Sequence, residues 1–230
     1  KKVVLLSPLV AATARPPLYD SDTPVYMYRP GEWKRETVIT DLHGVAHAVM
    51  PVHWKGKGEG LLTASFQGLR LYTPGKAPWK FVEISKGDPR PCPECGSSEI
   101  RLGKLGKTRM LVAIEPWHGN QVVVYMEHGK TWTRTVIEDA MINGHALAVG
   151  DLDGDGRDEI VSGFRGKGYR LTLYRPADAT GTKWSKQILD TGIAAAECKI
   201  EDFTGDGKPD IACIGASTGN VKLYENLAGR

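Results

Sequence analysis

Two short acidic segments carry oxygen-bearing side chains at their first, third, fifth and ninth positions. The first reads DLDGDGRDE from Asp151, and the second reads DFTGDGKPD from Asp202. Hard cations take several carboxylate and carbonyl oxygens at once, and a glycine within a tight loop lets the backbone bend around the ion. Short apolar runs flank both segments and are typical of strands, so each loop is expected to join two strands of a hairpin. We therefore predict two Ca²⁺ sites.

The spacing assigns the expected ligands of both sites. The last carboxylate stands at the ninth position of each loop, whereas the EF-hand places its bidentate glutamate at the twelfth. The main-chain carbonyls of Arg157 and Lys208 are expected to complete the two shells. The predicted metal residues are Asp151, Asp153, Asp155, Arg157 and Glu159 in the first loop, and Asp202, Thr204, Asp206, Lys208 and Asp210 in the second.

Both loops belong to a repeat of roughly 50 residues that contains only short strand-like runs, a pattern typical of β-propeller blades. Five runs end in tyrosine, and a run led by tryptophan follows four of them. A β-sandwich with accidental similarity is the alternative, which nine aligned aromatic positions disfavour. We predict an all-β fold, a β-propeller of four-stranded antiparallel blades. The aligned aromatics are Tyr28, Tyr72, Tyr125, Tyr174 and Tyr224, and Trp33, Trp79, Trp132 and Trp184.

The repeat predicts a single β-propeller domain over residues 1–230, with blades at about 1–44, 45–95, 96–142, 143–192 and 193–230. The middle three blades hold four strands each, whereas the first lacks strand 1 and the last lacks strand 4. A closed ring leaves no open sheet edge. Either five blades close with incomplete ends, or the chain is part of a seven- or eight-bladed ring completed by another chain or a missing segment. The tryptophans are expected to pack between blades.

The first fourteen residues, Lys1 to Ala14, resemble a signal peptide, with a basic end and an apolar run. Because the run aligns with a strand of the other repeats, the strand interpretation is favoured. Cys92 and Cys95 form a CPECG motif, for which a disulfide, a vestigial zinc knuckle and a zinc site remain open. Cys198 and Cys213 are expected to be ordinary buried thiols.

Composition argues against two classes of partner. The chain has 30 basic and 27 acidic side chains, a formal net charge of +3, and no basic stripe, so nucleic acid is not an expected partner. No apolar run approaches the roughly 20 residues that a membrane span requires.

A second group of polar residues is predicted at the opposite end of the blades from the acidic loops. Antiparallel strands place the start of strand 1 and the turn between strands 2 and 3 on one face. Several histidines around one opening can bind a transition metal such as Zn²⁺ or supply a base near neutral pH. The predicted catalytic residues are His47, His118, His145 and Arg165, and the predicted substrate-binding residues are His43, Gln67, Glu115 and Trp117.

A calcium-loop hairpin that recurs in this way resembles the FG-GAP/VCBS repeats of β-propeller proteins. The segments HGVAH (43–47), EPWHGN (115–120) and GHALAVGDLDGDGRDEI (144–160) are similar to the propeller part of aldos-2-ulose dehydratase-type proteins. This resemblance implies a carbohydrate ligand and a lyase or dehydratase reaction by β-elimination. The alternative is a non-catalytic propeller that binds glycan or protein. Calcium loops favour an extracellular or periplasmic location, where the ion is abundant.

Overall fold

The computed structural model describes residues 2–54, 56 and 58–227, and all the regular elements in this part are β-strands. None of the described residues forms a helix with the length and apolar character needed to cross a membrane. The chain divides into two compact units, residues 1–100 and 101–230.

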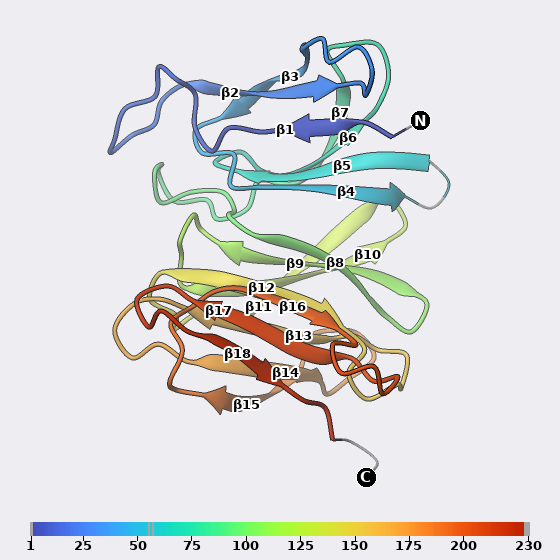
Figure 1. Ribbon diagram of the computed structural model, residues 1–230, viewed down its shortest axis with the longest axis vertical. Coiled ribbons are helices and arrows are strands. Elements are labelled where there is room, and N and C mark those ends of the chain that lie inside the picture. The colour runs from blue at the N-terminus through green and yellow to red at the C-terminus, as the bar shows by residue number, and fades with distance from the viewer. Residues whose placement is uncertain (1, 55, 57, 228–230) are drawn as a thin grey trace. The chain divides into compact units, whose positions relative to one another are not determined.

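The first unit contains a three-stranded and a four-stranded antiparallel sheet. The three-stranded sheet has the order β1-β2-β3, and the four-stranded sheet has the order β4-β5-β6-β7. Figure 1 shows these strands in blue to cyan and green. Their bounds are β1 (Val4–Leu6), β2 (Asp22–Tyr28), β3 (Glu36–His43), β4 (Ala48–Trp54), β5 (Gly58–Ser65), β6 (Gly68–Thr73) and β7 (Lys80–Ser85).

The second unit contains two four-stranded sheets and one three-stranded sheet, and β8 begins at the last residue of the first unit. The sheets have the orders β8-β9-β10-β11, β12-β13-β14-β15 and β16-β17-β18. Their bounds are β8 (Ile100–Leu105), β9 (Thr108–Glu115), β10 (Gln121–His128), β11 (Thr131–Glu138), β12 (Gly144–Gly150), β13 (Glu159–Phe164), β14 (Leu171–Pro176), β15 (Trp184–Asp190), β16 (Ala195–Glu201), β17 (Asp210–Gly215) and β18 (Val221–Tyr224).

Every sheet joins strands that are consecutive in sequence, and each pair is antiparallel, as in a propeller blade. The second and third strands of the complete sheets consist mainly of buried apolar residues, because side chains on both of their faces are covered; β9 and β10 are examples. The fourth strand, such as β11 or β15, is largely exposed. This arrangement confirms the predicted all-β class with four-stranded antiparallel blades, three of them whole and two incomplete.

The structure corrects two predictions about cysteines and tryptophans. Cys198 and Cys213 are not free thiols but form a disulfide between directly opposed positions of β16 and β17. Trp33 does not pack in a core: it precedes β3 and is 60% exposed, whereas Trp79 is buried among Val38, Ile39 and their neighbours. Trp33 lies well before its strand, which begins only at Glu36, whereas Trp79 directly precedes Lys80, the first residue of β7.

The structure also decides between the alternatives that the sequence left open for the CPECG motif and for the N-terminal run. Cys92 and Cys95 are joined by a disulfide, so their sulfurs are not available as zinc ligands. Within the apolar N-terminal run, Val4–Leu6 forms β1 and pairs with β2, with Val4 opposite Tyr28.

Candidate functional site

Strand β12 connects the two groups of polar residues predicted in the second unit. His145 is its second residue, and Asp151 follows its last residue directly. Strand β13 returns antiparallel to β12, with Gly150 opposite Glu159 and Gly144 opposite Phe164. The first acidic loop therefore lies at one end of this hairpin, and His145 and Arg165 lie at the other.

The first acidic loop gathers three of its predicted ligands. One carboxylate oxygen each from Asp151, Asp153 and Glu159 lies within 4.8 Å of the others. The backbone N–H groups of Gly154 and Gly156 donate to the two oxygens of Asp151, at 2.7 and 2.9 Å. Both glycines have φ near +80°, a conformation that L-residues with a side chain rarely adopt. The glycines of the motif thus fold the loop around Asp151.

Asp155 does not join this carboxylate group. Its Oδ1 accepts the backbone N–H of Arg157 at 2.8 Å, and its Oδ2 accepts Nε of the same arginine at 2.9 Å. The Arg157 side chain, through its hydrogen bond, holds the pKa of Asp155 below its usual range. The roles assigned to Asp155 and to the carbonyl of Arg157 in calcium binding stay predictions.

Glu159 is the most enclosed member of the group, with only 2% of its surface exposed. Its Oε2 accepts the backbone N–H of Leu152 at 2.8 Å, while Oε1 has no hydrogen-bond donor among the residues that the structure describes. Burial, followed by the charges of Asp153, Asp155 and Asp151, raises the pKa of Glu159 to about 7. Three clustered carboxylates with an unpartnered oxygen are a donor set that fits a hard divalent cation.

The second acidic loop has the same sequence pattern but a different internal arrangement. Asp210 is fully buried, and its oxygens accept the backbone N–H groups of Phe203, Thr204 and Asn226 at 3.1, 3.0 and 2.8 Å. These bonds, with that from Asn226 as the largest cause, lower the pKa of Asp210. The protein itself therefore compensates this carboxylate, in contrast to Glu159.

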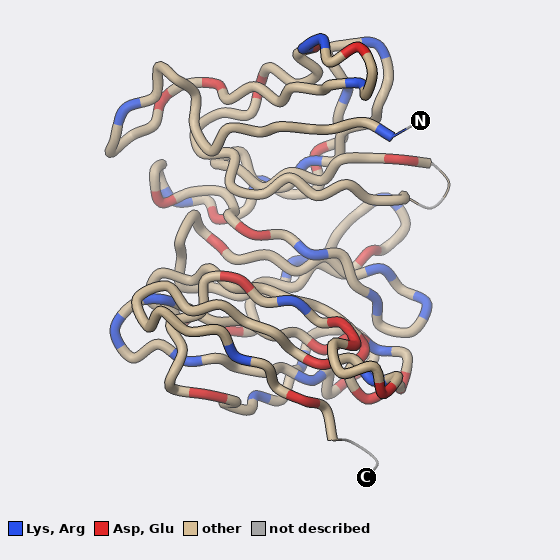
Figure 2. Tube along the Cα trace, in the orientation of Figure 1, with Lys and Arg blue, Asp and Glu red and all other residues tan. Residues whose placement is uncertain are grey.

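Other predicted ligands of the second loop hold its backbone in place. Asp202 accepts the N–H groups of Gly205 and Gly207 at 2.7 and 2.9 Å, and Asp206 accepts that of Lys208 at 3.0 Å. In the described part of the chain, the acidic side chains of this loop do not form a group as close as that of the first loop. In Figure 2 acidic residues are concentrated at the end of the unit where these two loops lie. The second calcium site, including Thr204, stays a prediction.

At the opposite end, Trp117, His118 and His145 form a run of ring contacts. The Trp117 and His118 rings are stacked with centroids 4.6 Å apart, and the His118 and His145 centroids are 5.3 Å apart. His118 has a φ of +50°, in the sparsely populated left-handed region. The turn after β9 thus holds His118 in an uncommon conformation beside His145.

The hydrogen bond of His145 determines which nitrogen carries its proton. Nδ1 lies 2.5 Å from the carbonyl oxygen of Ala196. A carbonyl oxygen can only accept, so Nδ1–H is the donor and the neutral ring has its lone pair on Nε2.

Arg165 is attached to the segment that leads into β12. Its Nη2 donates to Asn143 Oδ1 at 3.1 Å, and its backbone N–H donates to the Asn143 carbonyl at 3.0 Å. The N–H of Gly144 donates to the Gly119 carbonyl at 2.8 Å. Backbone bonds therefore connect the turns that contain His118 and Arg165 to one dipeptide, Asn143 and Gly144. Burial lowers the pKa of Arg165.

Glu115 is fully buried, and protein donors occupy both of its oxygens. Tyr125 Oη donates to Oε1 at 2.5 Å, and Arg134 donates to Oε2 through Nε and Nη2 at 3.1 and 2.8 Å. This geometry gives Glu115 a structural ion pair. Its predicted substrate-binding role would require breaking that pair.

The predicted residues of the first unit make contacts of their own. His47 Nδ1 lies 3.0 Å from Glu99 Oε1, and each side chain is only 7% exposed. His43 Nδ1 lies 3.0 Å from Asp22 Oδ1, and the His43 backbone N–H donates to Gln67 Oε1 at 3.0 Å. The participation of His47 in one site with His118 and His145 stays a prediction.

Sequence reasoning did not select Glu99, the buried partner of His47. A lone glutamate before an apolar run carries no strong signal, because exposed glutamates are common at such positions.

Comparison with known proteins agrees with the repeat and the sheet topology. Residues 151–213 match the FG-GAP-like repeat family. The matched segment contains both acidic loops and confirms the resemblance inferred from their spacing.

Over 216 residues the chain is 26% identical to an aldos-2-ulose dehydratase of Phanerodontia chrysosporium. The alignment covers 80% of this chain and 24% of the relative. The chain therefore spans about a quarter of the length of this curated relative. Its structure is similar to the extracellular domain of a protein from B. thetaiotaomicron described as a "putative one component system". That match has a TM-score of 0.52 and 14% identity, and covers 88% of this chain and 25% of the other. The structural match concerns the fold alone.

Proposed function

We propose that this chain is the propeller part of a carbohydrate-acting protein and that the turns around His145 carry a β-elimination site. The observation that supports this most directly is the contact of His118 with His145, whose Nδ1 proton is directed at the Ala196 carbonyl. This arrangement leaves Nε2 of His145 as the basic nitrogen. The similarity to an aldos-2-ulose dehydratase supports a sugar with a carbonyl group as the substrate class.

The proposed reaction has two stages. Nε2 of His145 removes the proton from the carbon next to the sugar carbonyl, and the electron pair moves onto the carbonyl oxygen. Arg165, the first residue after β13, stabilises that negative oxygen. The electron pair then returns to form a carbon–carbon double bond and expels the β-oxygen. His118 in its protonated form gives a proton to that oxygen, which leaves as water or an alcohol.

The side chain of Trp117 provides a flat surface beside these groups. Its ring is stacked on His118, and aromatic faces pack well against the C–H face of a sugar. His43 and Gln67 are further substrate-binding candidates from the sequence. A Zn²⁺ ion held by neutral imidazoles is an extension of the proposal; it would polarise the carbonyl oxygen.

The first acidic loop is proposed to bind Ca²⁺ through Asp151, Asp153 and Glu159. Neutralising the three clustered carboxylates would stabilise the β12–β13 hairpin that presents His145. An extracellular or periplasmic location suits both this ion and the two disulfides, which persist in oxidising compartments.

A non-catalytic glycan-binding propeller is the second candidate. It is favoured by the closed ion pair of Glu115 with Arg134, which removes one carboxylate from the set of available acids and bases. In that case Trp117 and His118 would form a recognition surface without turnover.

The test uses an aldos-2-ulose such as D-glucosone and follows the ultraviolet absorbance of the conjugated product. His145→Ala should lower kcat by about 10²- to 10⁴-fold. His128→Ala is the matched control, because His128 is exposed at the end of β10. Equal turnover by both variants would exclude His145 as the base. Binding of the sugar without any turnover by the wild type would favour the glycan-binding function.

A further inference from the structure

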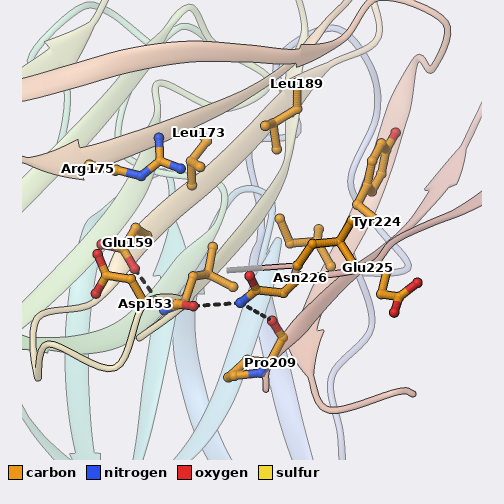
Figure 3. A pocket seen from close by; sticks show the side chains of 12 residues that line it. Asp153, Glu159, Leu173, Arg175, Leu189, Pro209, Tyr224, Glu225 and Asn226 are labelled. Atoms are coloured by element: carbon orange, nitrogen blue, oxygen red, sulfur yellow. Dashed lines mark hydrogen bonds between the residues drawn. The ribbon is translucent and has the colours of Figure 1, made fainter. Parts of the chain in front are cut away.

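A small cavity lies beside the first acidic loop, at the opposite end of β12 from His145. Its volume is about 210 Å³, and residues of β13, β14, β15 and β17 and the segment after β18 surround it. Figure 3 shows Asp153 and Glu159 on one side and Tyr224 to Asn226 on another. This volume is below that of pockets for drug-sized ligands and corresponds to a single small ring.

Aliphatic side chains from three strands, together with those of Leu152, Pro209 and Leu227, form most of the apolar part of the wall. Leu173 comes from β14, Leu189 from β15 and Ile211 from β17, and the ring of Tyr224 completes this part. Leu173 and Ile211 also belong to the buried core between the two sheets, so the wall is rigidly supported.

The polar part of the wall consists mainly of charged groups. Asp153, Glu159 and Glu225 contribute carboxylates, and Arg175 contributes a guanidinium. Asn226 Nδ2 bridges the loops by donating to the carbonyls of Leu152 and Pro209 at 2.6 and 3.1 Å, as the dashed lines in Figure 3 mark. The two acidic loops are thereby held around the cavity.

Glu159 supplies a separate indication of a ligand. This residue lines the cavity and is only 2% exposed, yet Oε1 has no donor among the residues that the structure describes. Because solvent still reaches this oxygen, it is open to a ligand hydroxyl or a cation in the cavity.

The wall chemistry selects among ligand classes. A purely apolar ligand would leave the charged groups of the wall without polar partners, and an anion would face three carboxylates against the one guanidinium of Arg175. A divalent cation in the loop would approximately balance the charges of the wall, which disfavours an amine. A neutral ligand with hydroxyl groups on one side and C–H groups on the other satisfies both parts of the wall.

We propose that this cavity is a subsite for one sugar ring, with hydroxyl groups directed at Asp153 and Glu159 and its C–H face on Leu173, Leu189 and Tyr224. The inference rests on the proposed calcium loop, because Asp153 and Glu159 would serve both ligands. Sugar and Ca²⁺ binding should therefore be coupled. The subsite is separate from the elimination site, since the two lie at opposite ends of the same hairpin.

The experiment measures binding of methyl α-D-mannopyranoside by titration calorimetry in calcium buffer, with cyclohexanol as the hydroxyl-poor ring of similar size. The sugar should bind and cyclohexanol should not. Replacing calcium with the chelator EGTA should weaken sugar binding by about tenfold. Leu189→Trp fills the cavity and should abolish binding, whereas Val221→Trp, at a position 78% exposed and outside the cavity, should leave it unchanged.

A second measurement requires no variant. Terbium replaces calcium, and its luminescence lifetime in H₂O and D₂O reports the number of bound water molecules. Saturating sugar should lower that number. No sugar binding, equal binding by Leu189→Trp, or an unchanged water number would overturn the subsite. Absence of terbium binding would overturn the calcium loop together with the subsite, and elimination activity on D-glucosone would still test His145 independently.

Discussion

Tyr224 Oη donates a 2.6 Å hydrogen bond to Oδ2 of Asp190. Asp190 is the last residue of β15, the outer strand of the preceding sheet. Lys222 Nζ lies 2.6 Å from the same oxygen. The relationship recurs: Tyr174 donates to Glu138 at 3.2 Å, and Tyr72 donates to Asp41 at 2.9 Å. In these three repeats the tyrosine near the end of the third strand thus fastens its sheet to an acid of the sheet before it, whereas Tyr125 donates to Glu115 of its own sheet.

This contact makes stability dependent on pH. The Lys222 and Tyr224 side-chain hydrogen bonds lower the pKa of Asp190 from 3.8 to about 2. Because the folded pKa is below the unfolded one, the stabilisation is fully present above pH 4 and is lost as pH falls from about 4 to 2. Asp190→Asn should reduce the free energy of unfolding by about 1–2 kcal/mol at pH 7.

Urea denaturation of wild type and Asp190→Asn at pH 7 and at pH 2.5 measures this effect. The difference between the two proteins should shrink at the lower pH. The exposed Asp139→Asn variant is the control. A difference that is the same at both pH values would show that Asp190 does not act through its charge.

The Cys198–Cys213 disulfide should contribute substantially to the stability of the last sheet. It closes a loop with a sequence separation of 15 residues, for which the chain-entropy estimate is about 3 kcal/mol. The double variant Cys198→Ala, Cys213→Ala should therefore melt at a lower temperature. Removing Cys92 and Cys95, which are separated by 3 residues, should cost less. Equal losses in the two double variants would contradict this ranking.

Calcium should raise the melting temperature, and Glu159 should be required for the increase. At a free concentration of 100 times Kd, a ligand that binds only the native state stabilises it by about 2.7 kcal/mol. Glu159→Gln removes one charge from the carboxylate group and should abolish most of the gain. Thermal melts with calcium and with EGTA measure it. A full calcium response in Glu159→Gln would place the binding site elsewhere.

Two tryptophans at equivalent positions of the repeat should differ in their energetic importance. Trp79 is 7% exposed and Trp33 is 60% exposed. Trp79→Ala should cost about 3–5 kcal/mol through loss of core contacts, whereas Trp33→Ala should change stability by less than about 0.5 kcal/mol. Chemical denaturation of both variants measures the two costs. Similar costs would mean that burial does not distinguish them.

The sequence by itself determined the strands, their grouping into sheets and the positions of the two acidic loops. These features are local: a short apolar run defines a strand, and an acidic turn with glycines at positive φ defines the connection to the next strand. The spacing of the recurring aromatics, from Tyr28 to Tyr224, then sets the length of each repeat. A sheet made of consecutive strands requires little information beyond this order, which is why the predicted blade class agrees with the structure.

The tertiary structure decided which partner each polar or sulfur-containing side chain meets. Cys198 pairs with Cys213 because the register of β16 and β17 places them opposite each other. Asp210 is satisfied by the backbone of Asn226, from beyond β18, whereas the equivalent Glu159 keeps an oxygen without a donor. Glu115 meets Arg134 and His47 meets Glu99. Residues distant along the chain provide these contacts, and spacing within a repeat contains no information about them.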